Sequence, residues 1–424
     1  MFQQVQTEVT SRGGTTPPPR LHEDKSIKEK LHRLLIEMVD VRAMLKLDEK
    51  VVCRELRTAI DKLFMSHPEL ARHREKDRLA QELVDEMVGF GPLESLLRDT
   101  TISDILVNGP KHVYIERYGQ IEETTVQFSD GDQLLRIIQR IASRVGRRID
   151  ESSPTVDARL PDGSRFHAVI SPIALDGSLV SIRRFTSHAI TPQQFVDGGG
   201  MSEEMMAFLQ TAVQTRLNMV IAGGTGSGKT TLLNLLSGFI SPQERIVTIE
   251  DAAELRLRQP HIARMETRCE NSEGKGRLST RDLIRNALRM RPDRIIVGEC
   301  RGEEVFDMLQ AMNTGHDGSL TTIHANSAED AISRLEMLLG LAQGNLPMWY
   351  IRKQIACSID LVVHVKRLSS GKRKVTQIGH VVKEGDNVAT KPIFSCRFND
   401  DETKPSFERF EIPVELKKKM AHQQ

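Results

Sequence analysis

Apolar positions in the first part of the chain repeat with the period of an α-helix. From Ser26 onward they recur in alternating steps of four and three, which gathers them on one face of a helix. The positions in this first run are Ile27, Leu31, Leu34, Met38, Val41 and Leu45. The spacing returns over 52–63 and 79–87, with Pro68 between these two runs. Three amphipathic helices with short connections predict a small bundle, and such apolar stripes are typical of core rather than of a site.

The texture of the sequence then divides the first half of the chain. A polar stretch rich in Thr, Gly and Pro predicts a disordered tail over 1–25, followed by the helical bundle segment over 26–75. Strand-like and helix-like pieces predict an α/β domain over 76–190. Its expected strands are 105–107, 113–115, 158–160, 166–170 and 179–185, with a helix over 134–145. Residues 191–200 end in three glycines and predict a flexible linker.

The sharpest local pattern lies between residues 217 and 234. A short apolar run from Leu217 to Ile221 predicts a buried parallel strand, and Gly223-x-x-x-x-Gly228-Lys229-Thr230 follows it. An apolar helical pattern begins directly afterwards. Strand, glycine-rich loop and helix in this order are the context of a phosphate-binding P-loop. A glycine-rich turn without a ligand is the alternative, and the flanking pattern favours the nucleoside-triphosphate site.

The physical chemistry of the loop assigns roles to its residues. Glycines let successive N–H groups close around phosphate oxygens, and the N-terminus of the helix points its dipole at the same anion. Lys229 adds a charge toward the β- and γ-phosphates, and the hydroxyl of Thr230 is an expected Mg²⁺ ligand. The residues expected to contact the nucleotide are Gly224, Thr225, Gly226, Ser227, Gly228, Lys229, Thr230 and Thr231.

Composition narrows the class of protein. With 424 residues, 39% hydrophobic and 28% charged, the chain reads as a soluble globular protein of two or three domains. No apolar run approaches the roughly 18 residues of a bilayer span, and no secretory signal pattern opens the chain. Five isolated cysteines argue against a disulfide framework or a Cys-based zinc module and for a reducing compartment. A net charge of +1 and 4% aromatic residues give little support to nucleic-acid binding.

Two further strand-like runs end in acidic residues. Ile246–Ile249 precedes Glu250-Asp251-Ala252-Ala253-Glu254, and Ile295–Val297 precedes Gly298-Glu299. In this part of the chain strands alternate with helices, as in a parallel sheet whose strands end at one edge. Two acidic loops at the edge that carries the P-loop can hold Mg²⁺ and orient or deprotonate a water. For any single acid, a helix N-terminal charge or a solvated loop is the alternative.

Histidines and arginines in the same region have more than one interpretation. A strand-like run ending at His324 can report on a γ-phosphate by hydrogen bonding. His316 fits a structural histidine equally well, and a metal site that includes Cys300 has no supporting ligand spacing. A helix capped by Ser279 or Thr280 carries Arg281, Arg285 and Arg289 on one face. Either a basic docking face or a solvated face fits this spacing.

Taken together, four boxes stand in a recognisable order. They are the Walker A loop Gly223–Thr230, the acidic box Ile249–Glu254, the variant Walker B box Ile295–Glu299 and the histidine box Gly315–His324. This chain resembles the secretion-motor ATPases of type II secretion, type IV secretion and type IV pili, over roughly residues 80–365. The phrases Ile102–Gly109 and Leu160–Arg165 also fit, and the resemblance is greatest to the CpaF branch, which drives Tad pili.

Two departures from the family pattern bear on this resemblance. The type II secretion branch often carries a tetracysteine zinc module, whose absence from this sequence favours the CpaF-like branch. Ala252 stands where many relatives have proline, a change we expect to be harmless. The motifs do not extend to the first 75 residues, so the resemblance assigns no role to them.

The resemblance implies a fold and a set of catalytic roles. The expected fold is α/β, with a RecA-like P-loop domain and C-terminal appendage over 201–424, preceded by a smaller α/β domain that covers the nucleotide and by the helical bundle. The implied cofactors are ATP and Mg²⁺. Glu254 is the expected water-activating acid and Glu299 the Walker B acid, with His324 beside them. The implied metal ligands are Thr230, Glu299 and Glu250; the implied arginine fingers are Arg165 and Arg183, with Arg159 and Arg184 as further candidates.

The resemblance also implies how the protein works. Family members are typically hexameric rings, so we expect a homo-oligomer, a hexamer, that is cytoplasmic and peripheral to the inner membrane. Its expected partners are the inner-membrane platform proteins of a pilus or secretion system, with no direct nucleic-acid contact. Closure about a hinge at 191–200 is expected to complete the site. The alternatives are a RecA-like nucleic-acid translocase and a nucleotide-gated regulator that barely hydrolyses ATP.

Overall fold

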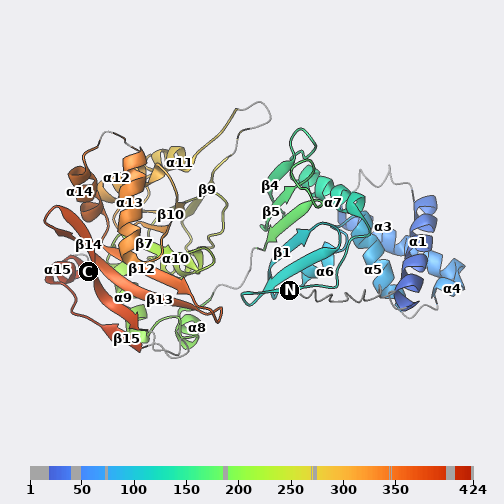
Figure 1. Cartoon of the computed structure of the whole chain (residues 1–424), viewed down its shortest axis with the longest axis horizontal. Helices are drawn as coiled ribbons and strands as arrows, with labels where there is room; N and C mark the ends of the chain where they lie inside the picture. Colours follow the sequence, from blue (N-terminus) through green and yellow to red (C-terminus); the bar gives the residue numbers. More distant parts are fainter. Residues whose placement is uncertain are drawn as a thin grey trace, which may run out of the picture. The chain divides into compact units, whose positions relative to one another are not determined.

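The chain forms two compact units, Met1–Arg184 and Phe185–Gln424, each with its own apolar core (Figure 1). A computed structural model describes most of the chain. The described residues are 19–39, 49–71, 75–184, 190–268, 270, 275–342, 344, 346–397 and 406–421. Each unit is treated by itself below.

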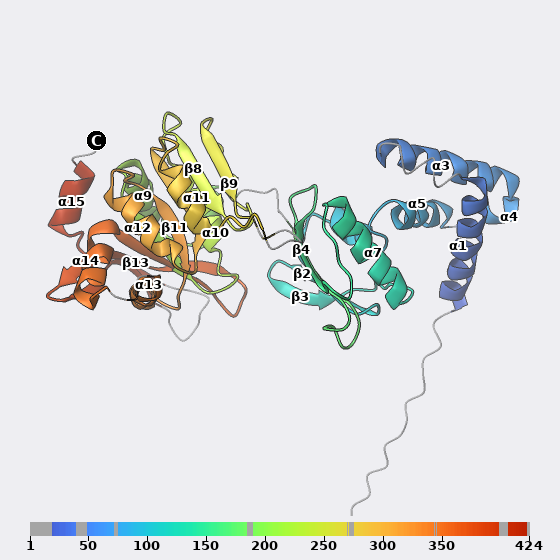
Figure 2. The same cartoon turned by 90° about the horizontal axis from the view of Figure 1, so that it is seen from above.

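The first unit begins with a cluster of helices, as the helical spacing predicts (Figure 2). The helices are α1 (Pro19–Met38), α3 (Glu49–Ser66), α4 (Pro68–Ala71) and α5 (Lys76–Met87). Leu31, Leu56 and Leu83 belong to their shared core. The tail prediction is wrong for residues 19–25, because α1 begins at Pro19, and proline is tolerated in a first helical turn. Residues 1–18, and the expected apolar positions Val41 and Leu45, lie outside the described residues.

A six-stranded antiparallel sheet forms the rest of the first unit. Its order is β3-β2-β1-β6-β5-β4, and it is flanked by α6 (Leu93–Arg98) and α7 (Gly131–Arg144). The strands are β1 (Ile102–Asn108), β2 (His112–Arg117), β3 (Gln120–Glu123), β4 (Thr155–Arg159), β5 (Arg165–Val169) and β6 (Leu179–Arg183). The apolar stripe of α7 packs on one face of the sheet, for example Ile138 with Phe166 in one core (Figure 2). Because side chains alternate along a strand, the opposite face carries polar residues.

The second unit is built on a nine-stranded sheet of order β15-β14-β13-β12-β7-β11-β10-β8-β9. The strands from β12 to β9 in this order are parallel, and β13, β14 and β15 add antiparallel strands beside β12. The parallel strands are β7 (Met219–Gly223), β8 (Ile246–Glu250), β9 (Ile262–Glu266), β10 (Arg294–Cys300), β11 (Leu320–His324) and β12 (Leu361–Arg367). The fold is therefore the expected α/β, RecA-like arrangement, preceded by a smaller α/β domain and a helical bundle.

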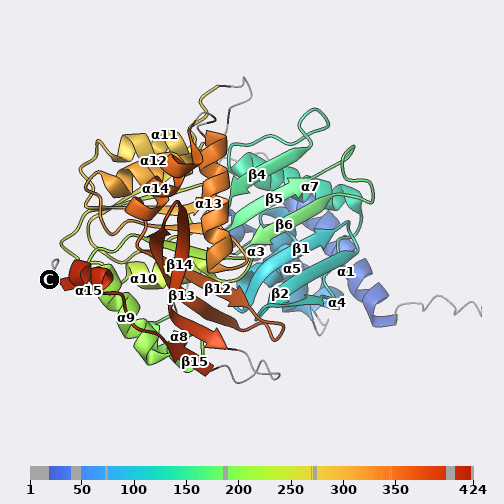
Figure 3. The same ribbon diagram turned by 60° about the vertical axis from the view of Figure 1, so that its left-hand side comes forward.

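Helices cover both faces of this sheet (Figure 3). One face packs against α9 (Glu203–Gln214) and α10 (Lys229–Ser237). The other packs against α11 (Thr280–Ala287), α12 (Glu304–Asn313), α13 (Ala328–Ala342) and α14 (Met348–Ser358). The parallel strands inside the sheet are largely apolar on both sides, as in β7, where every residue is buried, because both faces are covered. The edge strand β9 is only partly buried and carries Arg264 and Glu266.

The predicted flexible linker at 191–200 is instead a folded element. Helix α8 (Pro192–Asp197) begins with a capping box at Thr191, and Phe195 is buried in the core of the second unit. A Cβ on Gly200 would lie 2.5 Å from the Phe195 ring, so this glycine serves close packing. The backbone N–H of Val375 donates to the Gly200 carbonyl at 2.8 Å. The linker prediction is wrong because it rested on the three glycines, whereas the buried side chain of Phe195 anchors this segment to the core.

Long antiparallel strands form the C-terminal part of the second unit. β13 (Arg373–Glu384) and β14 (Asn387–Arg397) have 12 and 11 residues, and β15 (Ser406–Arg409) pairs with the end of β14. α15 (Val414–Ala421) is a Lys-rich helix, and the ammonium of Lys419 pairs with Asp360 at 2.8 Å. The appendage thus extends the sheet of the second unit.

A buried ion pair supports the amino-terminal edge of this sheet. Arg294, at the start of β10, has 0% of its side chain exposed and donates to both carboxylate oxygens of Glu244, at 2.7 and 2.9 Å. It also donates to the carbonyls of Val213 and Gly318. Because none of its side chain is exposed, this guanidinium cannot turn to solvent when a protein partner is lost.

We expect Glu244→Ala to lower the free energy of unfolding of the second unit by about 3 to 5 kcal/mol, because it leaves a buried guanidinium uncompensated. Urea denaturation followed by tryptophan fluorescence measures the change. The control is Glu408→Ala, which removes the partner of the exposed Arg397 and should cost less than about 1 kcal/mol. Equal midpoints for the two variants would contradict this role.

Candidate nucleotide site

The predicted P-loop connects β7 to α10 at the carboxyl edge of the sheet. Gly226 and Gly228 have φ of 68° and 96°, which side chains other than glycine rarely adopt. A Cβ on Gly223 would lie 2.4 Å from the Val365 carbonyl oxygen and 2.5 Å from the Ser227 hydroxyl. The loop therefore needs these glycines to keep its shape. The first N–H groups of a helix such as α10 have no intrahelical partners and can donate to an anion at this loop.

Lys229 lies across the mouth of this loop. Its ammonium donates to the carbonyls of Gly223 and Gly224, both at 3.0 Å. Burial lowers the pKa of Lys229, and the nearby carboxylate of Glu299 partly opposes that shift. The hydroxyl of Ser227 is buried and has no hydrogen-bond partner in the described structure. A cation, an orphan hydroxyl and free N–H groups around one loop fit the phosphates of a nucleotide.

Strand pairing brings the predicted acids and His324 to the same edge of the sheet. His324 pairs with Gly223 across β11 and β7, and β10 and β8 follow in order beyond β11. Glu250 ends β8, and Glu299 lies near the end of β10, where its carboxylate pairs with Arg301 at 2.5 Å. A carboxylate and the Thr230 hydroxyl near the loop are ligands that suit Mg²⁺, which is hard and prefers oxygen.

Glu250 is the most buried acid of the site. Only 3% of it is exposed, and its Oε1 accepts from the backbone N–H groups of Glu254 and Leu255, both at 2.8 Å. A Cβ on Gly298 would lie 3.0 Å from its Cγ, so the two acidic loops are in close contact. Burial raises the pKa of Glu250 to about 6, although these two N–H groups favour the charged form. Glu250 therefore holds the loop that carries Glu254; its role as a metal ligand stays a prediction.

The two histidines of the histidine box lie at opposite edges of the sheet. His324 is exposed at the carboxyl end of β11, whereas His316 precedes that strand and its Nδ1 lies 3.3 Å from the Ala311 carbonyl. This placement supports the structural interpretation of His316.

Cys300 is buried beside Thr321, and burial raises its thiol pKa to about 12. Within the described ranges, no group of three or more His, Cys, Asp or Glu residues is arranged to hold a metal.

The predicted arginine fingers form a row across the polar face of the first unit's sheet. Three of them lie opposite one another in register on the neighbouring strands: Arg159 in β4, Arg165 in β5 and Arg183 in β6. Asp104 in β1 lies opposite Arg183 and continues the row. Arg165 pairs with Asp157 at 2.6 Å and Arg183 with Asp104 at 3.2 Å. Arg184 instead donates to the Asp99 carbonyl. Strand register thus gathers three of the four candidates on one face.

The arginines of α11 are ion-paired to the neighbouring helix. Arg281 and Arg285 both donate to Asp307 of α12 at 2.8 Å, and Arg281 also pairs with Glu303. Ser279 caps the helix, as one of the two expected caps. Arg281 fits neither of the two interpretations, a basic docking face or a solvated face, because its ion-pair partners lie within the same unit. Arg289 is exposed beyond the end of the helix.

Two residues near the P-loop were missed by the sequence analysis. Thr322 of β11 donates to the Gly298 carbonyl at 2.8 Å and so links the histidine box to the Walker B strand. Arg373 of β13 donates from Nε to the Gly226 carbonyl at 3.2 Å. A run of basic residues over 366–374 was the available signal, but only strand pairing shows that it reaches the loop.

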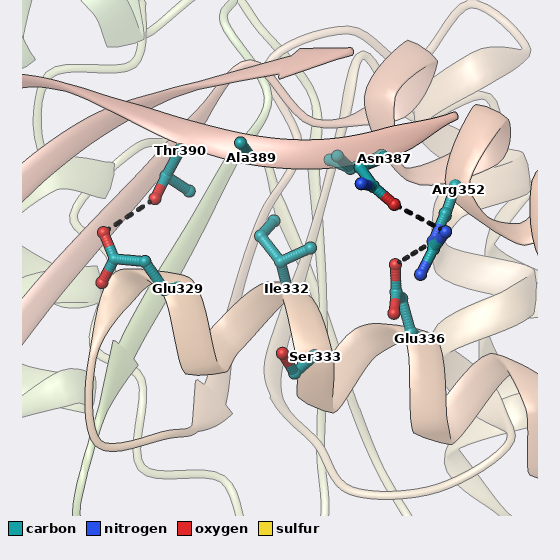
Figure 4. Close-up of a pocket in the computed structure, with 9 residues that line it drawn as sticks. Glu329, Ile332, Ser333, Glu336, Arg352, Asn387, Ala389 and Thr390 are labelled. Atoms are coloured by element: carbon teal, nitrogen blue, oxygen red, sulfur yellow. Dashed lines mark hydrogen bonds and ion pairs between the residues drawn. The ribbon is translucent and has the colours of Figure 1, made fainter. Parts of the chain in front are cut away.

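A second hollow lies away from these residues, between α13, α14 and β14 (Figure 4). It has a volume of about 370 Å³ and a mixed polar and apolar lining. Arg352 pairs there with Glu336 and donates to Asn387, both at 2.8 Å, and Glu329 accepts from Thr390 at 3.1 Å. Arg352 and Glu336 neutralise each other, and Glu329 accepts hydrogen bonds from Gln377 and Thr390, so these contacts join the helices to the sheet.

We expect Glu250→Gln to raise the thermal stability of the nucleotide-free protein at pH 8. Because the folded pKa lies above the unfolded one, the carboxyl contributes stability below about pH 4.5 that is lost as the pH rises through 6. The shift corresponds to about 2 kcal/mol. Glutamine keeps an oxygen for the N–H groups of Glu254 and Leu255. Melting temperatures at pH 8 and pH 5 test this; a gain of the same size at both would refute it.

Comparison with known proteins shows the family of this chain. The family model described as type II/IV secretion system protein matches residues 86–403. A putative conjugal transfer protein of Mycobacterium tuberculosis is 39% identical over 302 residues, covering 70% of this chain and 85% of the relative. The type IV secretion system protein VirB11 of Bartonella quintana is 32% identical. That match covers 68% of this chain and 90% of the relative.

One solved structure, the pilus retraction motor PilT with bound ADP, shares the fold. It has a TM-score of 0.50 and 20% identity, and the match covers 71% of this chain and 82% of that one. The family match spans most of the chain, including all four boxes and the sheet edge on which they meet. This chain therefore belongs to the family of type II/IV secretion system proteins.

Proposed function

We propose that this protein is the ATP-hydrolysing motor of a type II/IV secretion or pilus assembly system. The observation that carries the proposal is the meeting of Lys229, Glu299 and the Glu254 loop at one edge of a RecA-like sheet. A triphosphate cradle beside two acids has the parts that in-line attack of water on a γ-phosphate requires. The protein is an ATPase, and its family supplies the mechanical context of the hydrolysis.

The proposed roles follow from position. The loop N–H groups and Lys229 bind and orient the phosphates, and Glu254 accepts the proton of the attacking water. Thr230 and Glu299 would hold Mg²⁺, which supplies charge neutralisation of the phosphate oxygens. His324, beside Gly223, lies where a hydrogen bond can report on the γ-phosphate.

The remaining roles concern assembly. We propose a homohexamer in which Arg165 and Arg183 act as arginine fingers, supported by their shared position on the polar face of one sheet. None of the described helices is both long and apolar enough to cross a bilayer. A cytoplasmic ring bound to inner-membrane platform proteins, of the CpaF type that serves Tad pili, fits these features.

We expect Glu254→Ala and Glu299→Gln each to lower kcat by about 10² to 10⁴, because proton transfer and metal binding are lost, while ADP still binds. Steady-state phosphate release and ADP titration measure the two effects. The control is Glu303→Gln, which removes an exposed carboxylate four residues from Glu299 that pairs with Arg281. Unchanged turnover in both site variants would sink the ATPase assignment.

We expect DNA to leave the turnover unchanged at low salt, because near-zero net charge offers little to a phosphate backbone. Single-stranded and double-stranded DNA are added to the steady-state assay. Strong stimulation that disappears with salt would favour the nucleic-acid translocase instead.

Recovery of Lys229→Ala protein from membranes with inner-membrane proteins attached would identify the partner directly.

A further inference from the structure

Two arginines of the β12–β13 hairpin lie against the phosphate loop. β12 pairs with β7 as far as His364 opposite Ala222, and its last residues run past the end of β7. The side chain of Arg367 reaches the loop from there: a Cβ on Gly226 would lie 3.4 Å from its Nη1. Arg373 crosses the loop nearby, where a Cβ on Gly228 would lie 2.8 Å from its Cδ.

The hairpin opposes like charges at two successive positions. In the strand register, Arg367 lies directly opposite Arg373, and Lys366 lies directly opposite Lys374. Like charges directly opposite each other destabilise an antiparallel pair. Because side chains alternate along a strand, the arginine pair and the lysine pair occupy opposite faces. Lys374 donates to the Gly199 carbonyl at 2.9 Å, which leaves the arginine pair on the face of the P-loop.

The arginine pair adds to a charge that is already positive. Lys229 and the N-terminus of α10 lie at the same loop. Arg373 donates to the Gly226 carbonyl, and within the described part of the chain it forms no ion pair with a carboxylate. Clustered cations next to a glycine-rich loop are stabilised when an anion binds between them. The local repulsion therefore points to an anionic ligand.

We propose that Arg367 and Arg373 bind the phosphate groups of the nucleotide from the same subunit that supplies the P-loop. The inference rests on the proposed function. The planar guanidinium suits bidentate binding of phosphate oxygens. The arginines lie beside Gly226 and Gly228, in the part of a P-loop that cradles the α- and β-phosphates. ADP and ATP both carry these phosphates, so both nucleotides depend on the hairpin.

The test compares three charge-removing variants of the full-length protein. ADP with Mg²⁺ is titrated into Arg367→Gln, Arg373→Gln and Lys372→Gln. Lys372 is the matched control, because it is exposed, one residue from Arg373, and lies in the turn that joins the strands. We expect each arginine variant to raise the Kd of ADP about tenfold. Lys372→Gln should stay within about twofold of the wild type.

Melting temperature separates phosphate binding from support of the loop. Removing one of two opposed cations relieves repulsion, so nucleotide-free Arg373→Gln should melt at or above the temperature of the wild type. ADP affinity like that of Lys372→Gln in both arginine variants overturns the inference, as does a lowered melting temperature of Arg373→Gln with unchanged affinity in Arg367→Gln. Lys229→Ala is run alongside: if it binds ADP normally, the proposed function fails rather than this inference alone.

Discussion

Parallel pairing of β7, β11, β10 and β8 is the constraint on which the site depends. In a parallel sheet all carboxyl ends lie at one edge, so residues more than 100 positions apart in the chain become neighbours there. His324 lies beside Gly223 by register alone, and the acidic loops after β8 and β10 extend the same edge. The covering helices bury both faces, which leaves the loops at the ends of the strands as the place for polar chemistry.

Buried polar groups hold these loops in place. Glu250 gives up hydration to accept two backbone N–H groups of the acidic loop, and Gly298 is the residue that allows it to approach β10 so closely. Thr322 links the next strand to the Gly298 carbonyl. A desolvated carboxylate weakens the fold at neutral pH, and in return the loop of Glu254 has a defined path. Burial of Glu250 thus lowers the stability of the fold at neutral pH, while its two hydrogen bonds fix the position of the loop that carries Glu254.

Charge is distributed in a way that favours anion binding. Lys229, the N-terminus of α10 and the arginines of the β12–β13 hairpin surround one loop. In the sheet of the first unit, Arg165 and Arg183 are instead ion-paired with Asp157 and Asp104. In the second unit, Arg281 and Arg285 are neutralised by Asp307. A chain of net charge +1 therefore concentrates positive potential where phosphate is expected.

Local patterns in the sequence determined the helices of the bundle, the strands, the P-loop and the acids, because hydrophobic period and glycine spacing act over a few residues. Contacts between distant segments were decided only by the tertiary structure. Gly198–Gly200 resembles a linker in the sequence, but Phe195 packs this segment into the core. The hairpin arginines have no marker in the sequence, and only the pairing of β12 with β7 brings them to the P-loop. His316 and His324 look alike in the sequence, and strand direction places them at opposite edges of the sheet.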